Sequence, residues 1–254
     1  VLLANPGGYQ EDHSVQEALH LVQTTKALGL KVLLPPDQDA RTLLGLCESA
    51  ELPCQVYTWG EEHKREPLGR LLRESDCGCL VLPAPPVGLW ERMGIGGQAT
   101  IETLNQARQP CLIARGTHPY RKILVTVSPG PGSARAVDLA LDVARAFSSD
   151  LTACAAIPPA LVVGEEYGRE IRQALQHAVG MAALYSVQIE SELLEGNPIH
   201  QTLDMAAGFD LLVLAHRKNR HFHAARPDIS RHLLMRAPCS VLVLPFSEEE
   251  PGGG

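Results

Sequence analysis

The stretch from Asp210 to Pro245, DLLVLAHRKNRHFHAARPDISRHLLMRAPCSVLVLP, decides the fold class. It begins with one apolar run, Leu211 to Leu214, and ends with another, Val241 to Leu244. Uninterrupted apolar runs are typical of parallel strands covered on both faces, and the segment between them is long enough for a crossover helix. The stretch therefore predicts a strand, a loop, a helix and a second strand. The loop, 216–226, is expected at the carboxyl end of the first strand, where open α/β sheets bind ligands.

Composition narrows the class of protein. The chain has 254 residues and 45% hydrophobic content, enough for one or two domains of roughly 100–200 residues each. Its net charge of -7 argues against a nucleic-acid partner, because phosphate binding needs a basic surface. No apolar run approaches the ~18 residues that cross a bilayer, and no signal peptide is visible. The 7 cysteines are scattered without a CxxC pair, which predicts reduced, buried thiols and a cytoplasmic location.

The same order of elements occurs twice along the chain. Val81-Leu82-Pro83 with its loop and the run 110–113 corresponds to Val213-Leu214-Ala215 with its loop and the run 238–241. Each half has five candidate strands alternating with four candidate helices. We therefore predict two tandem doubly wound α/β domains rather than one long sheet. The expected divisions are a domain over 1–116, a domain over 117–247 and a disordered tail over 248–254.

Two helix starts have capping signals. Ser14 and Glu17 have the spacing of a capping box, in which the serine accepts a bond from the third helical amide and the glutamate returns one. Asn197 precedes Pro198, and asparagine followed by proline is typical of a helix N-cap and first helical position. We expect a helix to begin at each place.

The second half resembles a universal stress protein domain. The resemblance lies in the order of several short motifs, namely 123–127, Gly196-Asn197-Pro198, 210–213 and 237–243. The first half resembles the same family mainly over 83–114. The resemblance implies two five-stranded parallel sheets of order 3-2-1-4-5, paired through their last strands. In one branch of the family it also implies ATP bound at the ends of strands one and four.

The glycine pattern of that ATP-binding branch is altered in the second half. The pattern is Gly, two residues, Gly, nine residues, Gly and Ser or Thr, and it lets backbone amides surround phosphates. The corresponding positions are Ala215, Lys218 and, with one residue fewer, Pro227 and Asp228. Ser128 stands where the branch has an acidic residue after strand one. We therefore expect no conventional ATP binding and no cofactor.

The first half has lost the pattern differently. Pro83 and Pro86 replace the early glycines, and proline has no amide hydrogen to donate. Gly96 and Gly97 remain, but no Ser or Thr follows them.

The loop 216–226 carries the main functional hypothesis. Arg217, Lys218, Arg220 and Arg226 place four positive charges in a chain that is acidic overall. Guanidinium groups hold phosphates and carboxylates without close backbone approach, so these side chains could replace an amide site. The expected partner is an acidic segment or a small phosphorylated ligand, and the alternative is a solvated basic loop. The candidate ligand-binding residues are Ser128, Gly130, Ala215, His216, Arg217, Lys218, Arg220, Arg226, Asp228, Gly96 and Gly97.

Other chemistry is not supported. His221 and His223 alternate in an HxH, but no thiolate or carboxylate completes a metal site. Cys77 and Cys79 lack redox spacing and adjoin a predicted strand. Since no Ser/His/Asp or Cys/His set has motif support, we expect no metal and no enzyme activity.

Two functional classes follow. The first is a cytoplasmic stress or signalling protein that acts by binding, with its two domains paired within one chain and a homodimer left open. The alternative is the regulatory part of a membrane transporter, at the cytoplasmic face of the membrane. The start at Val1 instead of Met suits this alternative.

Overall fold

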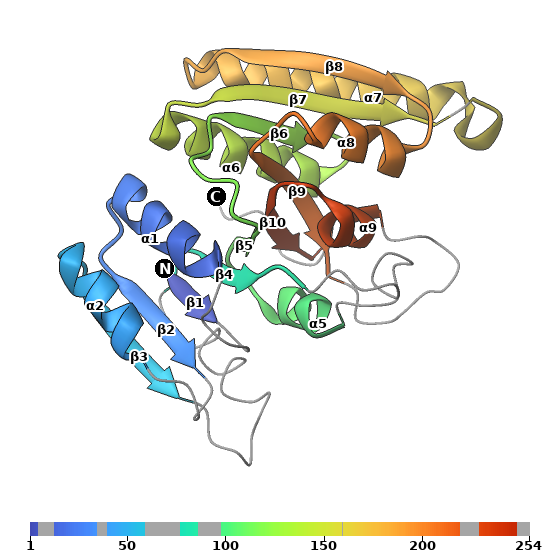
Figure 1. Ribbon diagram of the computed structural model, residues 1–254. Coiled ribbons are helices and arrows are strands. Elements are labelled where there is room, and N and C mark those ends of the chain that lie inside the picture. The colour runs from blue at the N-terminus through green and yellow to red at the C-terminus, as the bar shows by residue number, and fades with distance from the viewer. Residues whose placement is uncertain are drawn as a thin grey trace.

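The computed structural model shows one long sheet with helices on both faces (Figure 1). The structure describes residues 1–4, 13–34, 40–58, 77–85, 98–158, 160–218 and 229–247. Predictions that fall elsewhere, including the tail 248–254, lie outside the described residues.

The described elements of the first half alternate strand and helix. Its strands are β1 (Leu2–Ala4), β2 (Leu30–Leu34), β3 (Cys54–Thr58), β4 (Leu80–Pro83) and β5 (Cys111–Ala114). Its described helices are α1 (His13–Thr25), α2 (Arg41–Ser49) and α5 (Gln98–Gln106).

The second half has the same order with longer elements. Its strands are β6 (Lys122–Thr126), β7 (Asp150–Ile157), β8 (Ile189–Glu195), β9 (Leu211–Arg217) and β10 (Ser240–Phe246). Its helices are α6 (Pro131–Phe147), α7 (Ala160–Leu184, broken at Gly164), α8 (Pro198–Ala206) and α9 (Ile229–Arg236). The predicted cap of α8 is confirmed, since the Asn197 side chain accepts bonds from the amides of Ile199 at 2.9 Å and His200 at 3.3 Å.

Strand order confirms the predicted fold. The sheet runs β3-β2-β1-β4-β5-β10-β9-β6-β7-β8, so each half has the order 3-2-1-4-5, and all strand pairs within a half are parallel. The last strands, β5 and β10, pair antiparallel, with Leu112 opposite Leu242, as expected. This pairing makes the two five-stranded sheets continuous, so the expectation of two sheets instead of one long sheet is corrected. The join leaves neither last strand with an unpaired apolar edge.

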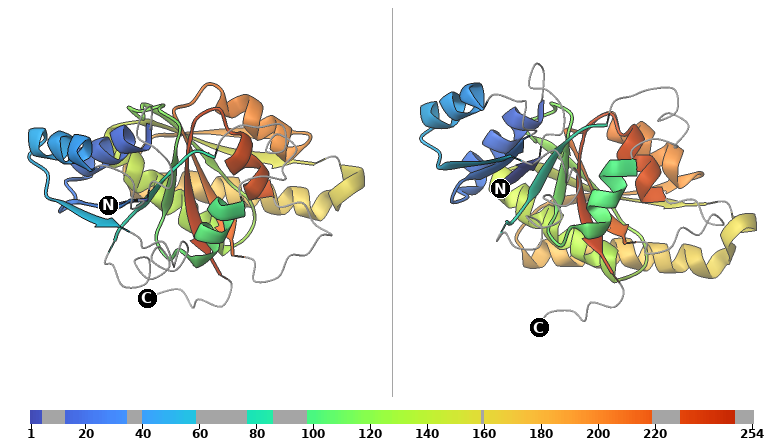
Figure 2. Two further views of the ribbon diagram at one scale, coloured as in Figure 1. Left: turned by 60° about the horizontal axis from the view of Figure 1, so that its bottom comes forward. Right: turned by 90° about the horizontal axis from the view of Figure 1, so that it is seen from below.

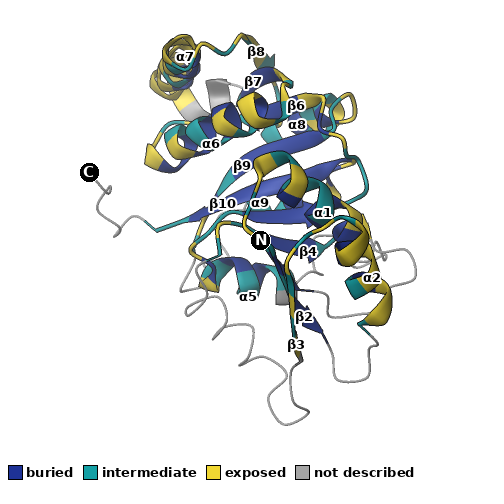
Figure 3. Cartoon of the chain, turned by 90° about the vertical axis from the view of Figure 1, so that its left-hand side faces the viewer, coloured by how far each residue is buried: buried dark blue, intermediate teal, exposed yellow. Residues whose placement is uncertain are grey.

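Two hydrophobic cores lie on opposite faces of the sheet. One core receives buried side chains from α1, α2, α6 and α7, and the other from α5, α8 and α9. Figure 2 shows α6 and α7 on the opposite side of the second half from α8 and α9. Figure 3 shows buried strands between helices whose outer faces are exposed. The first core is continuous across the two halves, because α1 contacts α6.

A buried carboxylate links the two halves. Glu17 on α1 is 0% exposed, and its Oε1 accepts bonds from the Arg115 amide at 3.0 Å, the Gly116 amide and the Ser240 hydroxyl at 2.8 Å. Its Oε2 accepts a bond from the Tyr120 hydroxyl. The predicted capping box is therefore wrong, because tertiary donors in the connecting segment and β10 take the carboxylate.

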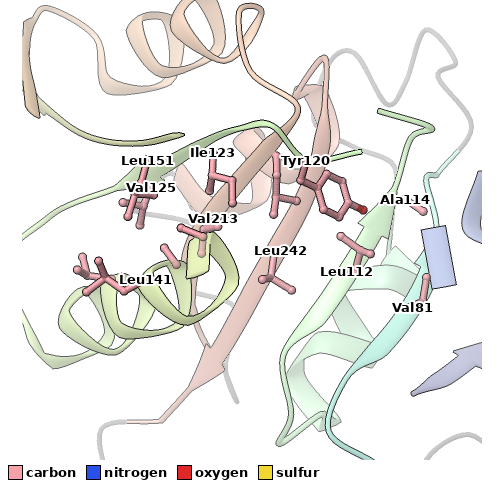
Figure 4. Packing of buried hydrophobic residues seen from close by; sticks show 14 of the residues in the cluster. Val81, Leu112, Ala114, Tyr120, Ile123, Val125, Leu141, Leu151, Val213 and Leu242 are labelled. Carbon is pink, nitrogen blue, oxygen red and sulfur yellow. The ribbon is translucent and has the colours of Figure 1, made fainter. Parts of the chain in front are cut away.

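An aromatic cluster lies beside this network. The ring of His20 on α1 is 5.6 Å from that of His118 and 5.4 Å from that of Phe147 on α6. Tyr120 lies 5.4 Å from Phe147 and packs between the halves near Leu112 and Leu242 (Figure 4). We call the region between α1 and α6, with the connecting segment 115–121, the seam.

Candidate functional site

The candidate site lies at the carboxyl ends of β6 and β9. These neighbouring strands are the switch point of the second half, since α6 follows β6 on one face and α9 follows β9 on the other. Ligands of open α/β sheets bind in the crevice that such a reversal creates. Ser128 and Gly130 follow β6, whereas Ala215, Arg217 and Lys218 lie at the end of β9, so the structure brings these predicted residues to one edge of the sheet.

The turn after β6 uses its polar groups internally. The Ser128 amide donates to the Ser133 hydroxyl on α6 at 2.9 Å. Gly130 has φ +115°, which favours glycine, and Pro131 at the start of α6 has no amide hydrogen. A Cβ added to Gly132 would lie 2.3 Å from the Phe246 ring, so the end of β10 covers the first turn of α6.

Polar groups at the end of β9 also form hydrogen bonds within the protein. The Lys218 amide donates to the Phe246 carbonyl at 2.8 Å, and Arg217 is exposed. His216 is 1% exposed, with Nδ1 2.8 Å from the Ser230 hydroxyl and Nε2 3.3 Å from Asn105 Oδ1 on α5. Both ring nitrogens have partners inside the protein, so a ligand could bind the His216 ring only by displacing one of them. His216 thereby joins the two halves.

Several predicted residues cannot be placed. Gly96, Gly97, Arg220, Arg226 and Asp228 lie outside the described residues. The same holds for the His221-Phe222-His223 motif. Among the residues that the structure does describe, no group of three or more His, Cys, Asp or Glu could hold a metal.

A cavity lies beside the turn after β6, and two of the predicted residues, Ser128 and Gly130, are among those that line it. It has a volume of about 380 Å³ and lies between α6 and α7, lined by Asp138 from the first helix and by Glu170 and His177 from the second. Asp138 Oδ1 is buried and has no hydrogen-bond partner among the described residues. Among the described residues that line the cavity there is no lysine or arginine, so its two carboxylates disfavour phosphate there. The sequence carries only a weak signal of this cavity, because Asp138 is one of two aspartates within an alanine-rich helix.

The cysteines are buried or half-buried free thiols, as predicted. Burial raises the pKa of Cys154 to about 12. The pKa of Cys79 also rises to about 12, mainly through burial and then through the neighbouring Cys77. Burial raises the pKa of Cys239 to about 11, although Arg115 opposes the shift. These thiols remain protonated near neutral pH, and a protonated thiol is a poor nucleophile.

Comparison with protein families identifies the fold. The family model "Universal stress protein family" matches residues 119–245, which is half of the chain. The chain belongs to the universal stress protein family. The comparison with curated protein sequences finds no match.

Solved structures agree on the tandem arrangement. A universal stress protein from Archaeoglobus fulgidus DSM 4304 is 12% identical with a TM-score of 0.71, and the match covers 96% of this chain and 98% of that one. A functionally unknown protein from Pseudomonas aeruginosa PAO1 is 17% identical with a TM-score of 0.72, covering 96% and 92%. At these identities the likeness shows the fold alone.

Two positions of the expected glycine pattern fall at the end of β9 in this universal stress protein. Ala215 lies within β9 and pairs with Leu244, and the amide at the next pattern position, Lys218, is bonded to β10. Among the described residues, no helix is long and apolar enough to cross a membrane.

Proposed function

We propose that this universal stress protein acts by binding rather than catalysis, and that it does not hold ATP through backbone amides. One observation carries the proposal. The amides of Ser128 and Lys218, at the ends of the two switch-point strands, already donate within the protein. A phosphate would have to displace a bond at each position, and a buried acceptor left without its donor costs about 1–3 kcal/mol.

A side-chain anion site replaces the amides in this proposal. Arg217 is exposed at the end of β9, and Lys218 is half-buried beside it. Both lie at the strand ends where this fold places ligands. Arginine grips phosphates and carboxylates through paired N–H groups and needs no glycine for close approach. We therefore assign this site, with Arg220 and Arg226 of the same loop, to an acidic partner segment or a small phosphorylated ligand.

The protonation of the buried thiols supports the proposal of a non-catalytic role. Burial first and Cys79 second raise the pKa of Cys111 well above its usual range, as burial does for Cys154. These thiols are therefore not nucleophiles near neutral pH. No observation among the described residues favours the alternative of a transporter-associated regulatory part.

The experiment uses phosphoserine peptides and inorganic phosphate as probes. Titration calorimetry compares the intact chain with a variant combining Arg217→Ala, Lys218→Ala and Arg220→Ala. We expect binding that weakens with salt, because exposed charges are screened over about 10 Å at 0.1 M, and that is lost in the triple variant.

A matched control removes three other exposed cations. Lys122→Ala, Arg145→Ala and Arg169→Ala change the net charge equally, and none of these residues lies at the carboxyl end of β9. This control should bind as the parent does. Equal affinity and salt dependence in the parent and the β9 variant would show that the patch is only surface.

A further inference from the structure

A second cavity lies in the seam, away from the strand ends of the candidate site. Its volume is about 600 Å³. Both halves line it, with Leu21 on α1, Leu139 and Val143 on α6, and Leu242 on β10. It extends to the amino ends of β2 and β4, near Leu30 and Cys79. Cavities of this size at domain junctions are common places for small-molecule binding.

Apolar side chains at the seam cavity remain incompletely buried. Leu28 on the segment after α1 is 97% exposed and lines the cavity. Leu21, Leu139 and Val143 are only half-buried, although the residues that adjoin them on the inner faces of their helices are buried. Filling the cavity with an apolar group would remove this surface from water, worth roughly 25 cal/mol for each Å².

The charged side chain that lines the seam cavity is positive. Lys31 on β2 lines it together with the neutral side chains of Thr25, Gln55 and Cys77. No aspartate or glutamate among the described residues lines the cavity. An apolar ligand with a carboxylate would therefore find a cation at the cavity and no opposing charge.

We propose that the seam cavity binds an apolar monocarboxylate of the medium-chain fatty acid class. The hydrocarbon tail lies between α1 and α6, and the carboxylate lies at Lys31. The ligand contacts both halves, so binding stabilises their pairing by linkage. Nothing in this site depends on the residues at the ends of β6 and β9.

Decanoate is the probe, and decan-1-ol is its uncharged counterpart. Titration calorimetry of the intact chain should show binding of decanoate, with weaker binding of the alcohol. Thermal unfolding should shift to higher temperature as decanoate is added, because only the folded state offers the cavity. Absence of decanoate binding to the folded chain would overturn the proposal.

Two substitutions separate the tail site from the head-group site. Val143→Trp fills the space between α1 and α6, and we expect it to abolish binding. Lys31→Met keeps the tail site, and we expect decanoate to bind about tenfold more weakly, with no preference left over decan-1-ol. Unchanged binding in Val143→Trp would refute the location, and unchanged preference in Lys31→Met would refute the carboxylate assignment.

Matched controls exclude global effects. Val179→Trp makes the same replacement at a position on α7 that is 38% exposed and does not line the seam cavity, and it should bind decanoate normally. Circular dichroism checks that each variant is folded; if Val143→Trp is not, Leu139→Phe takes its place with the same expected loss.

Discussion

The two halves have the same strand order but differ in the helix that each places at the seam. The buried residues of α6 in the second half are small or apolar apart from Ser133. The buried residues of α1 in the first half include Ser14 and Glu17. The strands differ too, since β4 and β5 are Leu80–Pro83 and Cys111–Ala114, whereas β9 and β10 each have 7 residues.

This difference indicates that the first half depends on the second for part of its stability. The carboxylate of Glu17, a residue of α1, is buried away from water. Its hydrogen-bond partners lie in the connecting segment and on β10. Burying a carboxylate is tolerated only when hydrogen bonds replace water. A repeated topology can therefore keep its strand order while one copy gains a polar attachment to the other.

The largest effect is expected from Glu17→Ala. The Arg115 and Gly116 amides and the Ser240 and Tyr120 hydroxyls would lose an acceptor. Since each buried group left unpaired costs about 1–3 kcal/mol, we expect a loss of at least about 3 kcal/mol in the free energy of unfolding, measured with urea. Glu48→Ala, at an exposed position on α2, should change it by less than about 0.5 kcal/mol. A small effect of Glu17→Ala would show that the attachment is not needed.

Gly132→Ala, in the second half, is expected to cause a smaller loss in the free energy of unfolding. The added Cβ would displace the Phe246 ring, which is 2.3 Å from its position. Overpacking of this kind costs about 1–3 kcal/mol, and the clashing atoms are at the far end of a side chain that can rotate, so we expect a loss of about 1 kcal/mol. Urea unfolding measures the change. A gain in the free energy of unfolding would mean that the Phe246 ring does not pack against Gly132.

A gain in stability is expected from replacing two helical glycines that have open space beside them. Gly45 on α2 and Gly180 on α7 are helical, and a Cβ at either would contact no atom within 4 Å. Alanine at each should stabilise the protein by roughly 0.5–1 kcal/mol, because it restricts the unfolded chain. Similar gains in both halves would show that they unfold as one unit. A gain confined to Gly180→Ala would show that they unfold separately.

The smallest effect concerns pH. Burial lowers the pKa of His20, and the facing His118 lowers it further, while Glu17 opposes both; Tyr120 is the other titratable group that its ring faces. The unfolded chain then binds more protons than the folded chain below the ordinary pKa of 6.5, so stability falls as the pH drops through this value.

His20→Phe should reduce this slope of stability against pH between pH 8 and pH 5.5, as measured by urea unfolding. The exposed His200 provides the control, because His200→Phe should leave the slope unchanged. An identical slope in the parent and in His20→Phe would contradict the role of the seam.

The fold could be predicted from the sequence because its signals are local. Apolar runs such as Leu211 to Leu214 need only neighbouring residues to be recognised, and Asn197 bonds amides two and three residues ahead. Glu17 failed as a capping prediction because its partners are about 100 or more residues away. The contact of His216 with Asn105 of the other half could not be predicted for the same reason, since the two residues are far apart in the sequence. The seam cavity has no sequence signal, because it exists only where α1 meets α6.

Equilibrium dialysis of ATP against the intact chain tests the central claim, that bonds within the protein have replaced the family's amide site. The account predicts no micromolar binding, because the amides of Ser128 and Lys218 are engaged and two carboxylates line the neighbouring cavity. Micromolar ATP binding that is lost in Ser128→Trp or Lys218→Glu would contradict it.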